Sequence, residues 1–482
     1  MWAEWQQTSP RERTTVVAGF VTLAALMMGH VLMETAADAI FLAHLPATQL
    51  PVVYLAIAVL SVAVTRLQRW LRQSFGPRSI LVGWLVFAAA GALGLWGVLE
   101  PLGETAIYVL YVFPGVISTV TLIQFWVLLG SSVTHDEAKH IYVLLGAGGA
   151  VGAIFGSGLA ALVSALSQPA DLIVLAAGVW ALTPLGVGRF VDSLAGSRAL
   201  AERPATRPVG WSTIRKLFEQ TYARRVAALA VLIPVAAILG DYLFKSLAAQ
   251  RVAPSSLGTF FGSVYLLLNL ASLIFQLLAV RGTVRQVGIA AALAILPGLL
   301  ALGGLGVAVG MAFTSAISIK VIDGSLRFSL YQTATELLYV PLPEDMRHEL
   351  KSFATTIAKR GGQAIGSIGL VVLLGGGGGS RTIGLTLLVV ASAAAVIAAS
   401  LRGPYRSLFR FRLRDERVEH LFDYPDLDPE MPETLTAALA SGEDGRVLAA
   451  LDLLETSDPS RPIPPLILYH PSVAVVRRAL AI

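Results

Sequence analysis

The stretch "METAADAIFLAHLPATQLPVVYLAIAVLS" (residues 33–61) has a counterpart about 207 residues later, "GDYLFKSLAAQRVAPSSLGTFFGSVYLLLNLAS" (residues 240–272). Each copy begins with an acid, places a second ionisable residue one helical turn later, and continues through a proline-containing polar turn into an apolar, tyrosine-containing segment. The matched ionisable pairs are Glu34 with Asp241 and Asp38 with Lys245. This correspondence predicts an internal duplication.

A second pair of segments matches in the same order. "FWVLLGSSVTHDEAKHIYVLLGAGGAVGAIFGS" (125–157) corresponds to "FSLYQTATELLYVPLPEDMRHELKSFATTIAKRGGQAIGS" (328–367), with a few residues inserted in the second copy. Chance similarity between Ala- and Leu-rich stretches is the alternative. It explains the matched apolar positions better than the matched acids, prolines and glycines, so we favour duplication.

The composition is that of a membrane protein. Of the 482 residues 55% are apolar and 14% are charged, and the mean hydropathy is +0.71, whereas soluble domains are about 45–50% apolar and about 25% charged. Apolar stretches of about 20 residues, enough to cross a hydrocarbon core of about 30 Å, recur along the chain. We predict about twelve membrane spans, at roughly residues 14–43, 50–68, 79–99, 105–133, 139–166, 170–190, 226–250, 258–280, 286–308, 311–340, 352–374 and 383–401.

Basic residues follow the second, sixth, eighth and twelfth spans: Arg66, Arg69, Arg72 and Arg78; Arg189 to Arg225; Arg281 and Arg285; and Arg402 to Arg414. The odd-numbered connections between the spans carry almost no Lys or Arg, so the positive-inside rule places both termini in the cytoplasm, and we expect a bacterial inner membrane. The net charge of +5 is explained by basic residues that interact with anionic lipid headgroups, so it does not imply a nucleic-acid partner. The absence of cysteine excludes disulfides and thiolate catalysis.

Six spans, a long basic loop and six further spans are typical of the major facilitator architecture, in which two parallel repeats enclose a substrate site near the membrane midplane. The predicted fold is therefore all-α: a polytopic membrane protein of twelve transmembrane helices in two six-helix pseudo-repeats, with a small cytoplasmic helical tail. The predicted parts are an N-terminal bundle (1–190), a cytoplasmic linker (191–225), a C-terminal bundle (226–402), a membrane-surface linker (403–444) and a HEAT-repeat-like segment (445–482).

Ionisable residues inside the spans are the candidate substrate-binding residues, because a charge at the bilayer centre costs about 2.5–3.5 kcal/mol and needs a partner or a wet cavity. In "KVIDGSLRFSLYQTATELLY" (320–339) three of them share one helix face, where the acid is expected to neutralise one of the two cations. The full candidate set is Glu34, Asp38, Asp241, Lys245, Lys320, Asp323 and Arg327. The alternative is that these residues pair wholly with one another and hold the two halves together.

A second set of charges falls at the predicted cytoplasmic ends of the spans. We predict that they form ion pairs of an inner gate, which break on opening; because exposed pairs contribute only about 0–1 kcal/mol each, a network is needed. The candidate gate residues are Asp136, Glu137, Lys139, Glu336, Asp345, Arg347 and Lys351.

Glycines and histidines indicate no further ligand site. "GAGGAVGAIFGSG" (146–158) has neither a preceding strand nor a following GK[ST], so it is not a phosphate-binding loop. Small residues at four-residue spacing in a membrane helix instead favour close helix packing. The seven histidines show no metal-ligand spacing, and we predict neither a cofactor nor a metal.

With those segments in hand, the sequence resembles the ATP/ADP translocase family, nucleotide carriers of plastids and intracellular bacteria within the major facilitator superfamily. The resemblance covers about residues 20–400. The segments that carry it are "FWVLLGSSVTHDEAKHIYVLLGAGG", "DYLFKSLAAQ", "RFSLYQTATELLYVPLPED" and "AKRGGQAIGS", which fall in order in both halves.

The resemblance implies that Asp241, Lys245 and Arg327 contact or gate an anionic nucleotide, and that Glu137 and Lys139 lie at the inner gate. The chain also departs from the family. Alanine at 36 or 37 replaces a basic residue of the first span, "YVFPGVIST" (111–119) lacks the acid of the fourth, and Thr335 replaces a lysine. These departures leave room for a less charged substrate.

The composition changes after Arg402. "RSLFRFRLRDERVEHLFD" (406–423) is basic and aromatic, which suits an anionic membrane surface. Residues 445–482 resemble one HEAT repeat, and because about three repeats are needed for an independent core, this segment either docks on the transporter or belongs to a longer protein. A cytoplasmic partner through this tail is therefore part of the prediction.

The predicted function is secondary transport of a nucleotide or related anionic metabolite by alternating access, with the tail as a regulatory part. One alternative is a transporter-derived sensor or scaffold that binds a ligand without carrying it. Another is a mover of a lipid or peptide. We predict no enzymatic activity, because the sequence shows no nucleophile and base pair and no metal motif.

Overall fold

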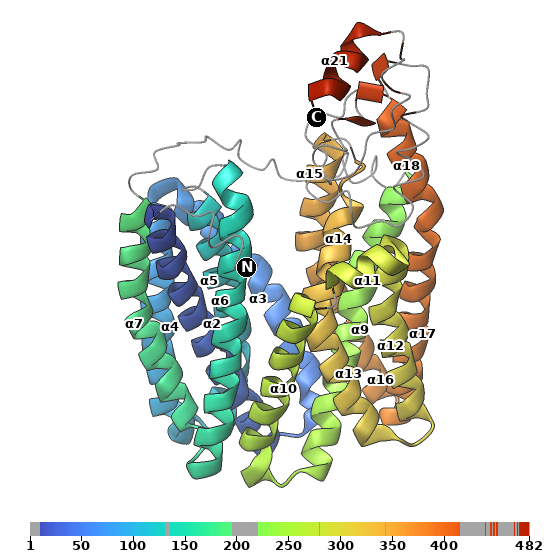
Figure 1. The fold of residues 1–482 in the computed structure, drawn as a ribbon. Helices are drawn as coiled ribbons and strands as arrows, with labels where there is room; N and C mark the ends of the chain where they lie inside the picture. The colour runs from blue at the N-terminus through green and yellow to red at the C-terminus, as the bar shows by residue number, and fades with distance from the viewer. Residues whose placement is uncertain are drawn as a thin grey trace.

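The computed structural model describes residues 10–130, 135–194, 220–278, 280–342 and 344–414, together with separate positions between 439 and 481. These residues are almost entirely helical, as predicted (Figure 1). The helices of the first half of the chain are α2 (Pro10–His44), α3 (Leu50–Ser74), α4 (Pro77–Leu102), α5 (Glu104–Gly130), α6 (His135–Leu166) and α7 (Asp171–Leu194). Those of the second half are α9 (Thr221–Arg251), α10 (Leu257–Leu278), α11 (Val280–Val287), α12 (Ile289–Ala308), α13 (Ala312–Leu326), α14 (Gln332–Leu338), α15 (Glu344–Ser352), α16 (Lys359–Gly375) and α17 (Ser380–Ser400).

Eleven helices in the described part of the chain are long and apolar enough to cross a membrane. The remaining predicted span, the tenth (311–340), is interrupted: α13 passes into a π-helical turn, η3 (Arg327–Tyr331), and then into α14. A second π-helical turn, η4 (Phe353–Ala358), precedes α16. A π-helical turn inserts an extra residue into a helix and is frequent at functional sites.

The spans form two helix groups (Figure 1). In the first group (α2–α7), α2 packs against α5, α6 and α7; in the second (α9–α17), α9 packs against α13, α16 and α17. Contacts between the groups run chiefly from α2, α3 and α6 of the first group to α9, α10 and α16 of the second. The groups therefore meet along a few long helices.

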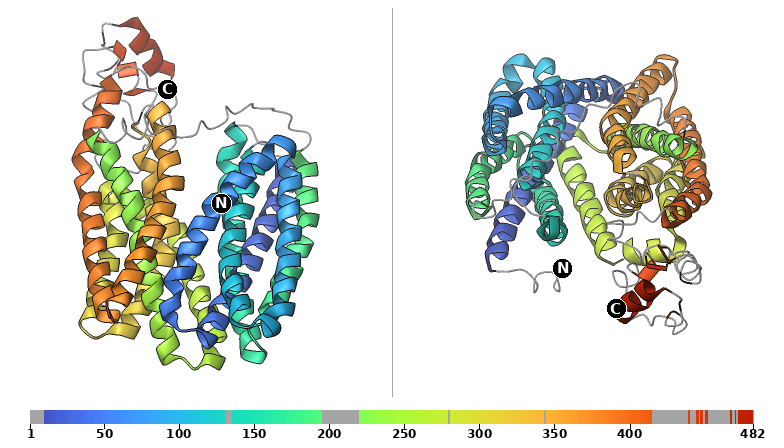
Figure 2. Two further views of the ribbon diagram at one scale, coloured as in Figure 1. Left: turned by 180° about the vertical axis from the view of Figure 1, so that it is seen from behind. Right: turned by 90° about the horizontal axis from the view of Figure 1, so that it is seen from above.

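The two groups approach each other at one end of the molecule. Two short 3-10 turns lie there, η1 (Ala47–Gln49) after α2 and η2 (Pro254–Ser256) after α9, and each contacts the opposite group: η1 contacts α9, and η2 contacts α2. Toward the other end, which carries the start of α2 and the helix α18 (Arg402–Arg414), the ribbons of the groups diverge (Figures 1 and 2). We call these the η1/η2 end and the terminal end.

Close packing of α2 against α6 depends on glycine. Glycines at four-residue intervals on α6 face backbone carbonyls at the same intervals on α2, so the two helices run in the same direction. A Cβ built on Gly148, Gly152 or Gly156 would lie 2.7, 2.0 or 2.9 Å from the carbonyl oxygen of Phe20, Ala24 or Met28, respectively. This confirms the packing interpretation of residues 146–158.

Parts of the C-terminal tail share a small apolar core. Val447, Leu451, Ile467 and Val475 are buried against one another. The helix α21 (Val473–Ala481) lies within the segment 445–482 that is predicted to resemble a HEAT repeat. The HEAT-like fold and the boundaries of the five parts of the chain stay predictions.

We expect Gly152→Ala to lower the thermal stability of the purified protein in detergent. The added methyl would meet a backbone carbonyl that cannot rotate away, and overpacking of this kind costs about 1–3 kcal/mol. Gly178→Ala on α7 is the matched control, because no atom lies within 4 Å of its built Cβ. A midpoint temperature for Gly152→Ala at or above that of Gly178→Ala would contradict the packing argument.

Candidate functional site

A buried network of four charged side chains joins the two helix groups. Lys245 Nζ of α9 lies 2.7 Å from Asp38 Oδ1 of α2 and 3.1 Å from Asp241 Oδ2, one turn earlier on its own helix. Asp241 Oδ1 in turn accepts from Lys320 Nζ of α13 at 2.5 Å. We call Asp38, Asp241, Lys245 and Lys320 the ionic network.

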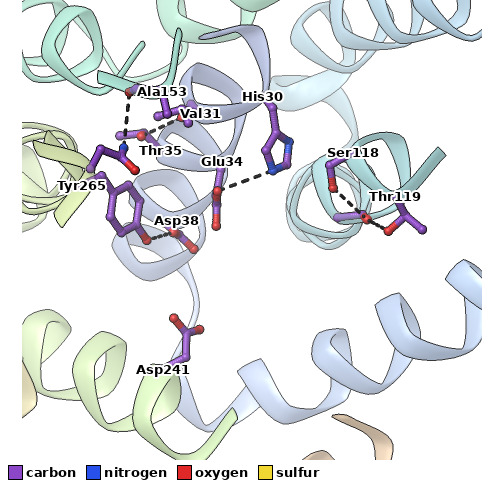
Figure 3. Close-up of polar contacts among 12 residues, drawn as sticks. His30, Val31, Glu34, Thr35, Asp38, Ser118, Thr119, Ala153, Asp241 and Tyr265 are labelled. Atoms are coloured by element: carbon purple, nitrogen blue, oxygen red, sulfur yellow. Dashed lines mark hydrogen bonds and ion pairs between the residues drawn. The ribbon is translucent and has the colours of Figure 1, made fainter. Parts of the chain in front are cut away.

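Tyrosines surround this network in an exchanged arrangement. Tyr54 Oη of α3, in the first group, donates to Asp241 of the second group at 2.7 Å. Tyr265 Oη of α10, in the second group, donates to Asp38 of the first at 2.5 Å (Figure 3). Each acid thus accepts a hydrogen bond from a tyrosine of the opposite group. Lys245 also donates to Tyr111 Oη of α5 at 2.8 Å.

The ionic network is electrically balanced, and it is most deeply buried at Asp38 and Lys245, whereas the side chains of Asp241 and Lys320 are 20% and 16% exposed. Asp38 is 1% exposed and Lys245 4% exposed. Two carboxylates face two ammonium groups, and the tyrosine hydroxyls satisfy further hydrogen-bonding capacity. Such burial is tolerable only when every charge has a partner, because the desolvation of an unpaired ion costs several kcal/mol.

Local helix geometry positions the network. Asp241 and Lys245 are four residues apart on α9 and therefore lie on one face, one above the other. Lys320 reaches the same carboxylate because α13 packs against α9. The sequence predicted that Asp323 would neutralise one cation of α13 and η3, and Asp323 does contact Arg327, whereas Lys320 pairs with Asp241 instead.

Basic residues form a second polar region on the second helix group. Arg327 is the first residue of η3. Its Nη2 contacts Asp323, and its buried Nε has no hydrogen-bond partner among the described residues. Arg360 of α16 donates from Nη1 to Gln363 Oε1 at 2.9 Å and from Nη2 to Thr119 Oγ1 of α5 at 2.7 Å. Lys359 directly precedes Arg360, and the positive charges of Arg327 and Arg360 both repel its ammonium group. We call Arg327, Lys359 and Arg360 the basic cluster.

On the first helix group, the acid Glu34 and the hydroxyl groups of Ser118 and Thr119 lie outside the ionic network. Glu34 lies one turn before Asp38 on α2, 3.7 Å from His30 Nε2, and its side chain is 42% exposed (Figure 3). Ser118 and Thr119 of α5 each donate to the carbonyl oxygen of Gly115. Glu34 thus lies near the ionic network without joining it.

The structure describes only part of the predicted gate. The side chains of Asp136, Glu137, Lys139 and Asp345 lie outside the described residues. Lys351 Nζ lies 2.6 Å from Glu336 Oε2, with both side chains about half exposed. Arg347 donates to the carbonyl oxygens of Val340 and Leu342 at 3.3 and 3.4 Å.

Sequence reasoning missed the tyrosines and two of the three residues of the basic cluster. Tyr54 and Tyr265 lie in the matched tyrosine-containing segments of the duplication, so the repeat contained a signal for them. Lys359 and Arg360 lie in the middle of an apolar span, which is the same signal that identified Lys320 and Arg327. Nothing in the sequence distinguished Tyr111.

We expect Lys245→Gln to destabilise the protein strongly, because it leaves two buried carboxylates without their shared cation. Removing one partner of a buried ion pair costs about 3–5 kcal/mol. Lys351→Gln is the matched control, since it removes an exposed pair worth about 0–1 kcal/mol. Thermal unfolding of both variants in one detergent measures the difference. Equal midpoint temperatures would show that the network does not hold the groups together.

Comparisons with known proteins agree with this description. No family model matches the chain. A plastidic ATP/ADP-transporter of Solanum tuberosum is 24% identical over 287 residues, which cover 52% of this chain and 45% of that protein. The chain thus matches less than half the length of this curated relative.

Solved transporters share the fold. The nucleoside transporter NupG matches with a TM-score of 0.56 at 13% identity, covering 83% of this chain and 99% of that one. A bacterial homologue of the iron transporter ferroportin, in an inward-facing state, matches with a TM-score of 0.59 at 13% identity, covering 83% and 100%. A POT family transporter in complex with 5-aminolevulinic acid matches with a TM-score of 0.58 at 12% identity, covering 81% and 96%. The proteins named here are transporters rather than enzymes, and the chain is an integral, multi-pass membrane protein with the major facilitator fold.

Proposed function

We propose that this protein is a secondary transporter that moves a nucleotide or related anionic metabolite by alternating access. The observation that carries the proposal is the ionic network, which joins the two helix groups through buried charges toward the η1/η2 end, while the groups diverge toward the terminal end (Figure 2). A contact of this kind closes one side of a transporter and opens when the groups rotate apart.

Separation of the groups would divide the network unequally. Lys245 and Lys320 both belong to the second group and would keep Asp241, whereas Asp38 would leave with the first group. A neutral network would then become a region of net charge +1 on one side and a single carboxylate on the other. The newly exposed cationic side would attract an anion, so opening and anion binding favour each other.

The substrate class rests on the basic residues and on the relative. Guanidinium groups bind phosphate and carboxylate oxygens through paired hydrogen bonds, which suits Arg327 and Arg360 to an anion. The relative's name, ATP/ADP-transporter, supports a nucleotide, and the missing basic residue at Ala36 or Ala37 leaves room for a less charged one.

The orientation and the tail complete the proposal. We place both termini in the cytoplasm of a bacterial inner membrane, so that the η1/η2 end faces outward and the conformation described is inward-open. The predicted gate residues, including Glu336 and Lys351, would then meet ions of the first group when the inner side closes. The helical tail would act as a regulatory or partner-binding part.

Uptake into proteoliposomes tests the proposal directly. Purified protein is reconstituted, and the uptake of labelled ATP, ADP, AMP and inorganic phosphate is compared with that of protein-free liposomes. We expect saturable uptake of at least one of these anions, abolished by Arg327→Ala. No saturable uptake by folded protein would contradict transport, and ligand-induced thermal stabilisation without uptake would instead favour a sensor.

A reversible cross-link between the helix groups tests alternating access, and the absence of native cysteine leaves no background. A Cβ built on Gly258 of α10 lies 2.8 Å from Ser164 Cβ of α6, so the pair Ser164→Cys and Gly258→Cys needs an outward adjustment of about 1 Å to form a disulfide. We expect oxidation to block uptake and a reductant to restore it, because the η1/η2 end can no longer open.

A cross-link inside one helix group is the control. A Cβ built on Gly186 of α7 lies 3.8 Å from Thr22 Cβ of α2, so Thr22→Cys with Gly186→Cys joins two helices of the first group. This disulfide should leave uptake unchanged if each group moves as a rigid body. Equal uptake by both oxidised pairs would contradict alternating access at this interface.

A further inference from the structure

The basic cluster carries more positive charge than its surroundings neutralise. Arg327, Lys359 and Arg360 contribute three cations, and Asp323 is the acid that contacts them in the described part of the chain. Arg360 has neutral partners, Gln363 and Thr119. The ionic network is balanced, whereas this cluster retains a net charge of about +2 by this count.

The cluster lies deep in the membrane-spanning part. Lys359 and Arg360 are near the middle of the span Met346–Gly375, and Arg327 lies at the junction of α13 and α14. A cation that faced lipid at this depth would be costly, so we place the exposed side chain of Lys359 in the interior between the groups rather than against lipid. Arg360, the next residue on α16, donates to Thr119 of the first group, which supports this placement.

Both π-helical turns adjoin the cluster. Arg327 is the first residue of η3, and Lys359 directly follows η4. Each turn changes the direction of the side chains that follow it relative to a continuous α-helix. Two separate helices therefore depart from regular geometry where they carry the cluster, as expected where backbone regularity is given up to place ligand-binding groups.

Hydrogen-bonding capacity in the cluster is unused. Arg327 Nε is buried and has no partner among the described residues, although its Nη2 contacts Asp323. An unsatisfied buried donor is costly, and a ligand oxygen would satisfy it. Arg360 meanwhile crosses to the first group and donates to Thr119 Oγ1, a neutral acceptor that an anion would readily replace.

We propose that Arg327, Lys359 and Arg360 form an anion subsite that binds a dianionic group, a phosphomonoester or a dicarboxylate, on the second helix group. This inference rests on the proposed transport function and specifies the charge of its substrate. The three cations, less the charge of Asp323, match two negative charges and leave about two of the roughly four charges of a nucleoside triphosphate uncompensated. Binding would release Thr119 from Arg360 and so break a polar contact between the groups.

Binding to the full-length protein in detergent tests the charge of the ligand. AMP, ATP and adenosine share one base and differ in charge, and inorganic phosphate and succinate are anions without the base. We expect AMP to raise the thermal midpoint saturably, adenosine to bind at least tenfold more weakly, and ATP to bind no more tightly than AMP. Tighter binding of ATP than of AMP would overturn the dianion assignment, and no binding of AMP, phosphate or succinate would overturn the subsite.

Charge-removing variants locate the subsite. Lys359→Gln and Arg360→Gln should each weaken AMP binding about tenfold or more, and Arg360→Lys should retain most of it, because the charge stays. Arg381→Gln, which removes an exposed arginine at the start of α17, is the matched control and should bind as the parent protein does. Unchanged AMP affinity in both Gln variants would overturn the subsite.

Asp323→Asn should strengthen AMP binding, whereas the preceding variants weaken it. It therefore distinguishes a role of Asp323 in ligand affinity from a structural role. Asp323→Asn removes a negative charge at nearly constant shape and with it the repulsion between this carboxylate and a bound anion, so AMP should bind about tenfold more tightly. Weaker AMP binding by a folded variant, judged by its thermal midpoint without ligand, would show that the pair of Asp323 and Arg327 is structural. If this variant does not fold, the Lys359 and Arg360 variants decide.

Uptake separates this inference from the proposed function. Charge-dependent AMP binding without uptake of any anion would leave the subsite standing and contradict transport. Saturable anion uptake that Lys359→Gln and Arg360→Gln do not change would leave transport standing and contradict the subsite.

Discussion

The ion pair between Asp38 and Lys245 is the contact on which the arrangement of the two helix groups depends. Both side chains are almost fully buried, so neither can lose the other without gaining water or a new partner. Desolvation makes a buried pair poor at adding stability but strict about which partner it accepts. The interface is therefore specific in geometry, and it becomes easier to separate once water reaches it. A purely apolar interface would lack this second property.

Close helix packing makes each of the two helix groups rigid. Because Gly152 brings α6 against the backbone of α2, the helix that carries Asp38 is fixed within its own group. On the other side, α16 approaches α9 closely, and a Cβ built on Gly362 would lie 2.5 Å from the carbonyl oxygen of Val231. In the proposed transport cycle, movement would therefore fall on the surface between the groups, where charged and tyrosine side chains make the contacts.

The sequence predicted the members of the ionic network better than their pairing. The duplication identified Asp38, Asp241 and Lys245 because an acid or a base recurs at one helical turn in both copies. It did not predict that Lys320 would contact Asp241, because that pairing depends on how α13 lies against α9. It also missed the exchanged tyrosines, since a repeat within one chain says nothing about which group each copy faces. The two π-helical turns leave no periodic pattern in the sequence, so the direction of the Arg327 side chain could not be predicted either.

One helix connects the two polar regions. Lys320 of the ionic network and Arg327 of the basic cluster lie seven residues apart on the same interrupted span, which is about two turns, or 10 Å. A ligand that draws Arg327 toward itself pulls on η3, the point where this span departs from regular α-helical geometry. Any rotation there is transmitted along α13 to Lys320 and hence to Asp241. On the proposed transport function, a ligand bound at the cationic cluster would therefore change the strength of the contact between Lys320 and Asp241.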